Sequence, residues 1–204
     1  MFTSSRIALS AAMATAVAAA LATPSAHAAP EIQFTPSTST IAVGQVFDVL
    51  LTGTSFDATS GGTPIANVTG GQNLQFSFDP LRFEVLSVSI DPRWTFAAGN
   101  KPGVIDPVNG SISGMAFGVF PATTDDDFDI ATFTLRALAP GAGALVLNSG
   151  QFIGTVGGKP GQLITASFGE AAISVGSVVP EPQQWALLLA GLGLVALRRR
   201  PRDA

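Results

Sequence analysis

Apolar and polar residues alternate over short segments through the middle of this chain, the pattern of β-strands that bury one face. In Val46–Thr54, for example, Phe47, Val49 and Leu51 fall on one face. The same alternation predicts further strands over Asn73–Phe78, Phe83–Ile90, Ile112–Phe120, Asp129–Ala137, Ala144–Leu147, Gln151–Val156 and Leu163–Val175. Glycine, proline, asparagine and aspartate separate these segments, as tight turns between antiparallel strands require. The pattern predicts an all-β fold of two packed sheets.

Three of the predicted strands have a defined inner face. We expect these faces to be formed by Leu74, Phe76 and Phe78; by Leu86, Val88 and Ile90; and by Ala131, Phe133 and Leu135. Two segments without clear alternation, Asp57–Gly71 and Asp91–Gly110, are expected to be long loops. No helical stripe of apolar residues runs through the middle of the chain, so helices are expected at its two ends only.

The N-terminal end is a continuous apolar run with the features of a secretory signal peptide. Met1–Arg6 carries one basic side chain, Ile7–Leu21 is apolar and rich in alanine, and the small residues Ala26 and Ala28 flank His27. These features predict export through the Sec translocon and cleavage by signal peptidase after Ala28. The alternative is an uncleaved membrane anchor.

The C-terminal end combines prolines, an apolar run and arginines in a fixed order. The segments are Val179-Pro180-Glu181-Pro182, the run Trp185–Leu197, and a basic tail over 198–202 that begins with Arg198, Arg199 and Arg200. The apolar run partitions into lipid, while the arginines stop transfer and stay on the cytoplasmic side. Its 13 residues reach about 20 Å as a helix, short of the roughly 30 Å of a bilayer core. A run this short favours transient residence in the membrane.

This tail resembles the PEP-CTERM sorting signal of Gram-negative bacteria, through Val179, Pro180, Glu181 and Pro182, the apolar span and Arg198–Arg200. The resemblance implies recognition by an exosortase, a membrane-embedded enzyme similar to cysteine transpeptidases. It implies export through the inner membrane, a transient membrane-anchored state, and then a location at the cell surface or in the extracellular matrix. It also implies a bacterium that makes exopolysaccharide or biofilm. A plain C-terminal membrane anchor is the alternative.

A second resemblance covers the middle of the chain. Ile41–Val49, Leu74–Val88 and Asp129–Ala137, followed by Pro140-Gly141, are similar to the corresponding segments of cohesin-like domains. The resemblance implies a jelly-roll β-sandwich of nine strands, related to bacterial carbohydrate-binding modules. It does not imply a dockerin partner. We therefore expect three parts: a signal peptide over 1–28, a cohesin-like domain over 29–178, and a sorting signal over 179–204 with its transmembrane segment at 185–197.

Charge and missing residue types exclude several functions. Between Ala29 and Val179 the chain has 12 acidic and 5 basic side chains, a net charge of −7, which repels nucleic acid. Cysteine is absent, and the only histidine, His27, leaves with the signal peptide. Serine–histidine–aspartate and cysteine–histidine catalysis and histidine or cysteine zinc sites are therefore excluded. Carboxylate chemistry is the remaining enzymatic option, and no cofactor is expected.

The densest charge cluster consists of Asp125, Asp126, Asp127 and Asp129. Calcium is bound by six to eight oxygen atoms, so clustered carboxylates are calcium-ligand candidates. The spacing is not that of an EF-hand loop, however, and no glycine stands at its sharp turn. The alternative is a solvated acidic loop that leads into the next strand and discourages edge pairing.

Two further groups of residues are candidates for carbohydrate chemistry. Asp79 with Glu84, or Glu84 with Asp91, are candidate carboxylate pairs of a glycosidase. Asp79 is also explained by a turn with the following proline, and Glu84 by an outward position on its strand.

Arg93 and Trp94, with Phe96 nearby, follow the strand that ends at Ile90. An exposed tryptophan beside an arginine can stack on a sugar ring, and the alternative is an aromatic side chain that fills the core.

The sequence thus predicts an exported, non-catalytic surface or matrix protein that binds polysaccharide or protein. The alternative is a small carboxylate-dependent enzyme that acts on polysaccharide.

Overall fold

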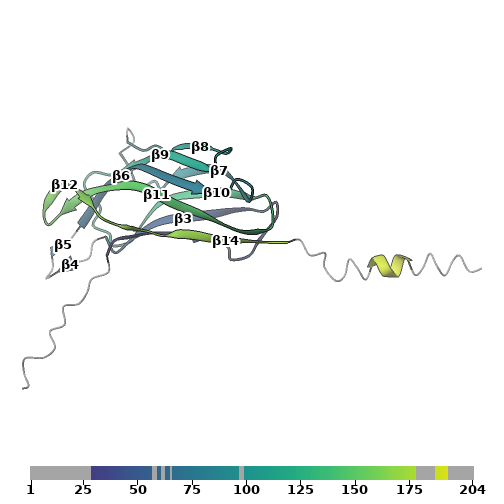
Figure 1. Cartoon of the computed structure of the whole chain (residues 1–204). Helices are drawn as coiled ribbons and strands as arrows, with labels where there is room; N and C mark the ends of the chain where they lie inside the picture. The colour runs from purple at the N-terminus through teal and green to yellow at the C-terminus, as the bar shows by residue number, and fades with distance from the viewer. Residues whose placement is uncertain are drawn as a thin grey trace, which may run out of the picture.

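Two β-sheets face each other in the computed structural model, which describes residues 29–56, 59–60, 63–64, 66–96, 99–177 and 187–192. Figure 1 shows them as two layers of strands along the length of the domain. The first sheet has the order β13 (Ser167–Phe168), β1 (Glu31–Pro36), β3 (Val46–Thr54), β10 (Phe128–Ala137) and β7 (Phe83–Ile90). Its neighbours pair antiparallel except β1 and β13, which run parallel.

The second sheet covers the other side of the core. Its order is β2 (Ile41–Ala42), β14 (Glu170–Gly176), β11 (Gly141–Val156), β6 (Ala66–Phe78), β9 (Ser111–Gly118) and β8 (Val104–Asp106). The long strand β11 also pairs with β12 (Lys159–Ile164). A separate hairpin joins β4 (Thr59–Ser60) to β5 (Thr63–Pro64) and lies at the same end of the domain as β12 (Figure 1).

Alternate residues of the facing strands form one apolar core. Phe76 of β6 lies across the layers from Phe133 of β10, with ring centroids 5.0 Å apart, and Phe34 of β1 lies 6.2 Å from both rings. Edge-to-face contacts of this kind stabilise a core beyond the burial of apolar area. The cluster includes most of the predicted inner faces, namely Phe47, Val49, Leu51, Leu74, Phe76, Phe78, Ala131, Phe133 and Leu135.

The strand predictions hold best where alternation is strict. β3 and β7 begin and end at the predicted residues, and β10 differs by one residue at its start. The segments Ala144–Leu147 and Gln151–Val156 are two parts of the single strand β11. Leu163–Val175, predicted as one strand, is divided among β12, β13 and β14. Where a strand begins and ends depends on the strand that it pairs with. The local alternation of apolar and polar residues carries no information about this pairing.

The inner face predicted for β7 is wrong at Leu86. Leu135 of β10 pairs with Val85, and Thr134 pairs with Ser87, so Leu86 is the extra residue of a bulge. A bulge shifts the side-chain alternation by one position. Phe83 and Val85 are therefore buried before the bulge, whereas Leu86 is 38% exposed.

Both predicted long loops contain strands. The segment 57–71 includes β4, β5 and the first part of β6, and the segment 91–110 includes β8. The glycine-rich start of β6 pairs with β9, where Gly70 lies opposite Gly118 and Gly71 opposite Phe117. Glycines weaken a strand signal in sequence, yet here they permit close approach of two strands.

Most of the two terminal predictions lie outside the described residues. This holds for the signal peptide over 1–28, for the sorting motif Val179–Pro182 and for Arg198–Arg200. Residues 187–192, within the predicted transmembrane segment, form a helix with exposed side chains. Within the described ranges, no helix has both the length and the apolar character needed to cross a membrane.

Candidate functional site

A cavity of about 410 Å³ lies between the loop that follows β7 and the loop that follows β9. These strands belong to different sheets, so both layers contribute to the site. Its lining residues are Arg93, Trp94, Val119, Pro121, Thr123 and Asp125. The structure thus brings together Arg93, Trp94 and Asp125, which sequence reasoning had assigned to two unrelated candidates. The volume is in the range of small-molecule sites, about 300–1,000 Å³.

Asp91 shapes the first loop. Its Oδ1 accepts a hydrogen bond of 2.9 Å from the Arg93 backbone, and its carbonyl accepts one of 3.1 Å from the Trp94 backbone. Its own N–H donates to the Ile130 carbonyl at 2.9 Å, which ties the turn to β10. The turn formed by Asp91 places the side chains of Arg93 and Trp94 in different surroundings. Arg93 remains partly exposed, whereas Trp94 enters the core.

Trp94 forms the floor of the cavity. Its side chain is 2% exposed, its Nε1 donates a 2.9 Å hydrogen bond to the Asp129 carbonyl, and its ring lies 4.5 Å from Phe117 and 5.4 Å from Phe128. The interpretation of Trp94 as an exposed stacking platform is therefore wrong, and the core-filling alternative describes it. The ring is buried because an aromatic cluster of β9 and β10 surrounds it.

Asn100 joins the loop after β7 to the end of β9. Its side-chain Nδ2 donates to the Trp94 carbonyl, and its Oδ1 accepts a 2.9 Å hydrogen bond from the Gly118 N–H. Gly118 ends β9 immediately before the second loop. One side chain thus holds the backbone beside Trp94 and the backbone before Val119 at a fixed separation. This bridge fixes the positions of the two backbone segments that lead into the cavity, so the cavity is part of the ordered fold.

Arg93 and Asp125 place a donor and an acceptor at the cavity. Arg93 Nη1 lies 3.0 Å from Asp125 Oδ2, and Arg93 Nε lies 3.5 Å from Asp91 Oδ1. The side chains of Arg93 and Asp125 are 38% and 58% exposed. Exposed ion pairs contribute only about 0–1 kcal/mol to folding. The pair therefore contributes little to the stability of the domain, and its main consequence is that a guanidinium donor and a carboxylate acceptor are available to a ligand.

Two exposed phenylalanines belong to the two loops that line this cavity. Phe120 lies between two lining residues and is 84% exposed, and Phe96 is 57% exposed. The Phe96 N–H donates to the Gly118 carbonyl at 2.9 Å, so Phe96 lies next to the segment that carries Phe120. A Cβ at Gly118 would lie 3.6 Å from the Phe96 Cβ, and one at Gly99 would lie 2.7 Å from its Cδ1. Only the Gly99 distance is too short for a side chain, so Gly99 leaves room for this ring, whereas the Gly118 distance is an ordinary contact.

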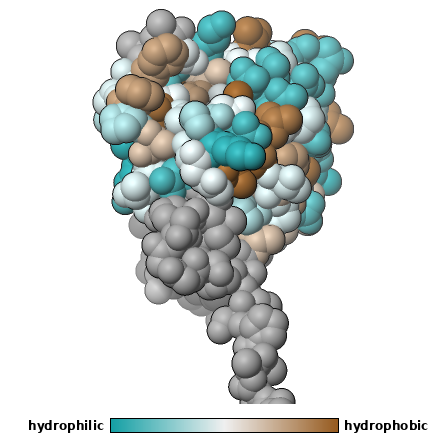
Figure 2. All heavy atoms as spheres, turned by 90° about the vertical axis from the view of Figure 1, so that its left-hand side faces the viewer, coloured by the Kyte–Doolittle hydropathy of each residue, from teal (hydrophilic) through white to brown (hydrophobic). Residues whose placement is uncertain are grey.

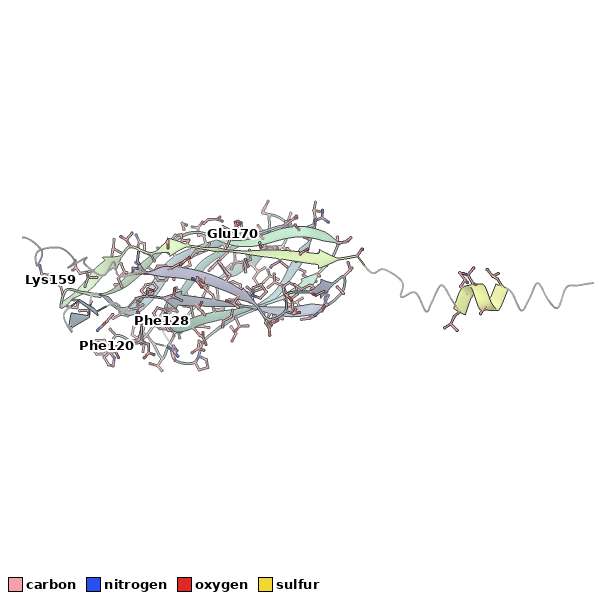
Figure 3. All side chains as sticks on the ribbon, turned by 90° about the horizontal axis from the view of Figure 1, so that it is seen from below. Phe120, Phe128, Lys159 and Glu170 are labelled. Carbon is pink, nitrogen blue, oxygen red and sulfur yellow. The ribbon has the colours of Figure 1, made fainter. Side chains whose placement is uncertain are left out.

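The exposed Phe120 lies at one end of the sandwich. Figure 2 looks onto the end where β12 and the β4–β5 hairpin lie, and apolar residues there alternate with polar ones. Figure 3 places Phe120 at the periphery, at the same end as Lys159 of β12. Binding residues are often found on loops that a rigid scaffold positions, and Phe120 lies on such a loop between two residues that line the cavity.

Asp125 of the acidic cluster lines the cavity, whereas Asp126 and Asp127 hold their loop by hydrogen bonds. Asp127 Oδ1 accepts a 3.1 Å hydrogen bond from the Ser55 N–H, and the Asp126 carbonyl accepts one of 3.0 Å from Phe56. Ser55 has a positive φ of 59°, a conformation that these contacts support. In the part of the chain that the structure describes, no three acidic, histidine or cysteine side chains are placed to hold a metal ion. The calcium interpretation of Asp125–Asp129 thus gains no support from the geometry.

The carboxylates proposed for glycosidase chemistry have local structural partners. Asp79 Oδ1 accepts a 2.9 Å hydrogen bond from the Leu81 N–H, as expected for its turn. Glu84 Oε2 lies 3.2 Å from Arg136 Nη1 across the β7–β10 pair. Asp91 shapes the turn before Arg93. Each carboxylate is thus explained by the local structure around it.

Sequence reasoning missed the second loop of the site. The predicted strand Ile112–Phe120 includes Val119 and Phe120, but β9 ends at Gly118. The signal was the Phe-Pro pair itself, because proline cannot continue a strand ladder and restricts the residue before it. This pair predicts that Phe120 lies beyond the last paired residue, where nothing in the sheet covers its ring.

Comparisons with known proteins identify the fold. No protein-family model matches the chain, and no curated protein matches it. The seventh ScaB type I cohesin from Pseudobacteroides cellulosolvens matches with 16% identity and a TM-score of 0.55, covering 75% of this chain and 96% of the cohesin. The cohesin module of a family 33 glycoside hydrolase from Clostridium perfringens matches with 13% identity and a TM-score of 0.52, covering 72% and 98%.

A chain of a type I cohesin–dockerin complex from Clostridium thermocellum matches with 11% identity and a TM-score of 0.53, covering 73% of this chain and 100% of its own. At such identities the likeness shows the fold and does not transfer a partner. The domain therefore has a cohesin-like β-sandwich fold, as its sequence resemblance implied.

Proposed function

We propose that this chain is an exported, non-catalytic binding protein of the cell surface or extracellular matrix. The observation that carries the proposal is the exposure of Phe96 and Phe120 on the two loops that line a cavity of a cohesin-like sandwich. Exposed aromatic side chains on loops, held by a rigid scaffold, are typical of recognition surfaces. The Clostridium thermocellum structure is a complex of a cohesin with a dockerin, which supports a binding role for the fold.

The two ends of the chain support the location. Ala26 and Ala28 end a signal-peptide pattern, so Sec translocon and signal peptidase are the first partners. Pro180, Glu181 and Pro182 precede the apolar run, and an exosortase is the partner that the resemblance implies. In this proposal the domain passes the inner membrane, is held there briefly by its tail, and is then attached or released outside the cell, in association with exopolysaccharide.

Fractionation of the native host, with mass spectrometry of both ends of the mature protein, tests the proposal. We expect the chain in the surface or extracellular fraction, with its first residue at Ala29 and its C-terminal tail removed. Replacement of Pro180, Glu181 and Pro182 by alanine should trap an unprocessed form in the membrane. Replacement of the neighbouring Gln183 and Gln184 by alanine is the matched control and should leave processing intact. Wild-type location and mass for the triple variant would refute the sorting step.

A glycan turnover assay tests the non-catalytic part of the proposal. Neutral and acidic polysaccharides, incubated with the full-length chain, should show no new reducing ends. Turnover that is lost when Asp79, Glu84 or Asp91 is replaced by its amide would instead identify a carboxylate-dependent enzyme.

A further inference from the structure

The exposed rings at this site are not required by the fold. Phe120 follows the end of β9 and is 84% exposed, while the core-facing phenylalanine of the same strand, Phe117, is 3% exposed. Phe96 is 57% exposed, although it is held by a backbone hydrogen bond to Gly118. The two loops that line the cavity thus each carry one exposed ring, Phe96 two residues after Trp94 and Phe120 between Val119 and Pro121. Such rings suit a ligand with an apolar face of its own.

The polar side chains of the site can bind hydroxyl groups of a ligand whose apolar face stacks on the rings. Arg93 and Asp125 offer a guanidinium donor and a carboxylate acceptor 3.0 Å apart, both open to solvent. Neighbouring hydroxyl groups on a sugar ring can use both at once, since one hydroxyl donates to the carboxylate while the next accepts from the guanidinium. Thr123 lines the same cavity, and its Oγ1 accepts a 3.2 Å hydrogen bond from the Asp125 N–H.

The charge around the site selects for a neutral ligand. The single positive charge of Arg93 already faces two carboxylates, Asp91 at 3.5 Å and Asp125 at 3.0 Å. Asp126 and Asp127 follow directly in the same loop, and the domain from Ala29 to Val179 has a net charge of −7. An anionic polymer such as a polyuronate would be repelled by this surface.

We infer that the site formed by Phe96, Phe120, Arg93 and Asp125 binds a neutral polysaccharide built from hexopyranose units. The inference rests on the proposed binding function and names its ligand class. A pyranose ring has a face of C–H groups and a rim of hydroxyl groups. The face stacks on Phe120 or Phe96, and the rim bonds to Arg93 and Asp125, above the buried floor of Trp94. The cavity volume of about 410 Å³ accommodates a sugar unit beside these side chains.

Trp94 supplies the reporter for a binding experiment, because it lines the cavity and the chain has only two tryptophans. The full-length chain in detergent, with Trp185→Phe, is titrated with cellohexaose, mannohexaose and a β-galactan oligosaccharide as neutral probes. An alginate oligosaccharide is the anionic probe. We expect a saturable change in tryptophan fluorescence with at least one neutral probe and none with alginate. No response to any neutral probe, or tighter binding of alginate, would overturn the inference.

The variants assign that response to the site. Phe120→Ala and Phe96→Ala should each weaken binding about 10-fold, as loss of an aromatic anchor does at other interfaces. Val108→Ala is the matched control, because Val108 is 83% exposed and precedes β9 at its opposite end. It should bind as the wild type does. Unchanged binding by Phe120→Ala and Phe96→Ala would show that the rings are not the platform.

A photo-crosslinking residue at position 120 separates this inference from the proposed function. In host cells, crosslinks to polysaccharide support the inference. Crosslinks to a protein alone overturn it, yet leave a surface binding protein in place. A chain that is never found outside the inner membrane refutes the proposed function, whatever the titration with neutral probes shows.

Discussion

Trp94 Nε1 donates a hydrogen bond of 2.9 Å to the carbonyl oxygen of Asp129, 35 residues later in the chain. The bond joins the loop after β7 to the start of β10, and the indole is 2% exposed beneath the cavity. A single side chain therefore couples the core of the sandwich to its candidate ligand site.

Removal of this indole should destabilise the domain strongly. Trp94→Ala leaves a cavity against Phe117 and Phe128, and we expect a loss of about 3–5 kcal/mol in the free energy of unfolding. Trp94→Phe keeps a ring but loses the Nε1 donor, so a smaller loss of about 1–2 kcal/mol is expected. Urea denaturation followed by circular dichroism measures both. Phe96→Ala, at an exposed ring, is the control and should change stability by less than about 0.5 kcal/mol.

The sequence predicts the sandwich better than it predicts the site. Strict alternation predicts β3 residue by residue, because its inner residues Phe47, Val49 and Leu51 all face one core. The error at Leu86 came from a bulge that only the pairing with β10 reveals. Trp94 shows the same limit, because tertiary contacts alone decide that this aromatic residue after β7 is buried. Phe120 differs, because the proline that follows it already indicates a position beyond the paired part of the strand, where its ring is exposed.

The Arg93–Asp125 pair should contribute little to folding. Both side chains are partly exposed, so solvent screens the attraction between them. A double-mutant cycle with Arg93→Ala and Asp125→Ala should give a coupling free energy below about 1 kcal/mol, decreasing as salt is raised. Thermal unfolding in low and high salt measures it. A coupling free energy several times larger would show that the pair mainly stabilises the fold and is not available to bind a ligand.

The fold should be independent of calcium. Asp127 accepts a hydrogen bond from the Ser55 backbone, and Asp125 pairs with Arg93, so these carboxylates have protein partners. With calcium at about 10 mM, above the roughly 1 mM dissociation constants of weak extracellular sites, we expect the melting temperature to change by less than about 1 °C. Chelator should have as little effect. A rise of several degrees with calcium would restore the calcium interpretation of the acidic loop.

Asp106 should titrate at unusually low pH. The Asn109 side chain donates to its Oδ2 at 2.7 Å, and the backbone N–H groups of Asn109 and Val108 donate to its Oδ1 at 3.0 Å. These bonds, the Asn109 side chain first, lower the pKa of Asp106 below its ordinary value of 3.8. Because the folded pKa is the lower one, the stabilisation is complete above 3.8 and is lost as pH falls through the folded pKa.

Carbon-detected NMR of the Asp106 carboxyl group measures this titration directly. Asn109→Ala removes the largest cause and should raise the pKa of Asp106 toward 3.8 while leaving the two backbone donors. A midpoint for the wild type at or above 3.8 would contradict the hydrogen bonding seen in this turn.

Close approach of β6 and β11 should make Gly154 intolerant of any side chain. A Cβ at Gly154 would overlap the Asn67 carbonyl oxygen and lie 2.8 Å from Ile164 Cδ1. The carbonyl belongs to the neighbouring backbone and cannot turn aside, so the two strands would have to separate. We expect Gly154→Ala to lower the free energy of unfolding by about 3 kcal/mol. Urea denaturation of the purified variant gives the value.

Gly176→Ala is the matched control for this steric argument. Gly176 ends β14, and a Cβ there would approach only the Ile41 carbonyl oxygen, at 3.7 Å, which is ordinary contact. Its φ lies outside the left-handed region, as does that of Gly154, so neither substitution adds backbone strain. The control should change stability by less than about 0.5 kcal/mol. Because the two variants add the same methyl group to the same kind of strand, equal stabilities would mean that β6 and β11 are further apart than the overlap requires.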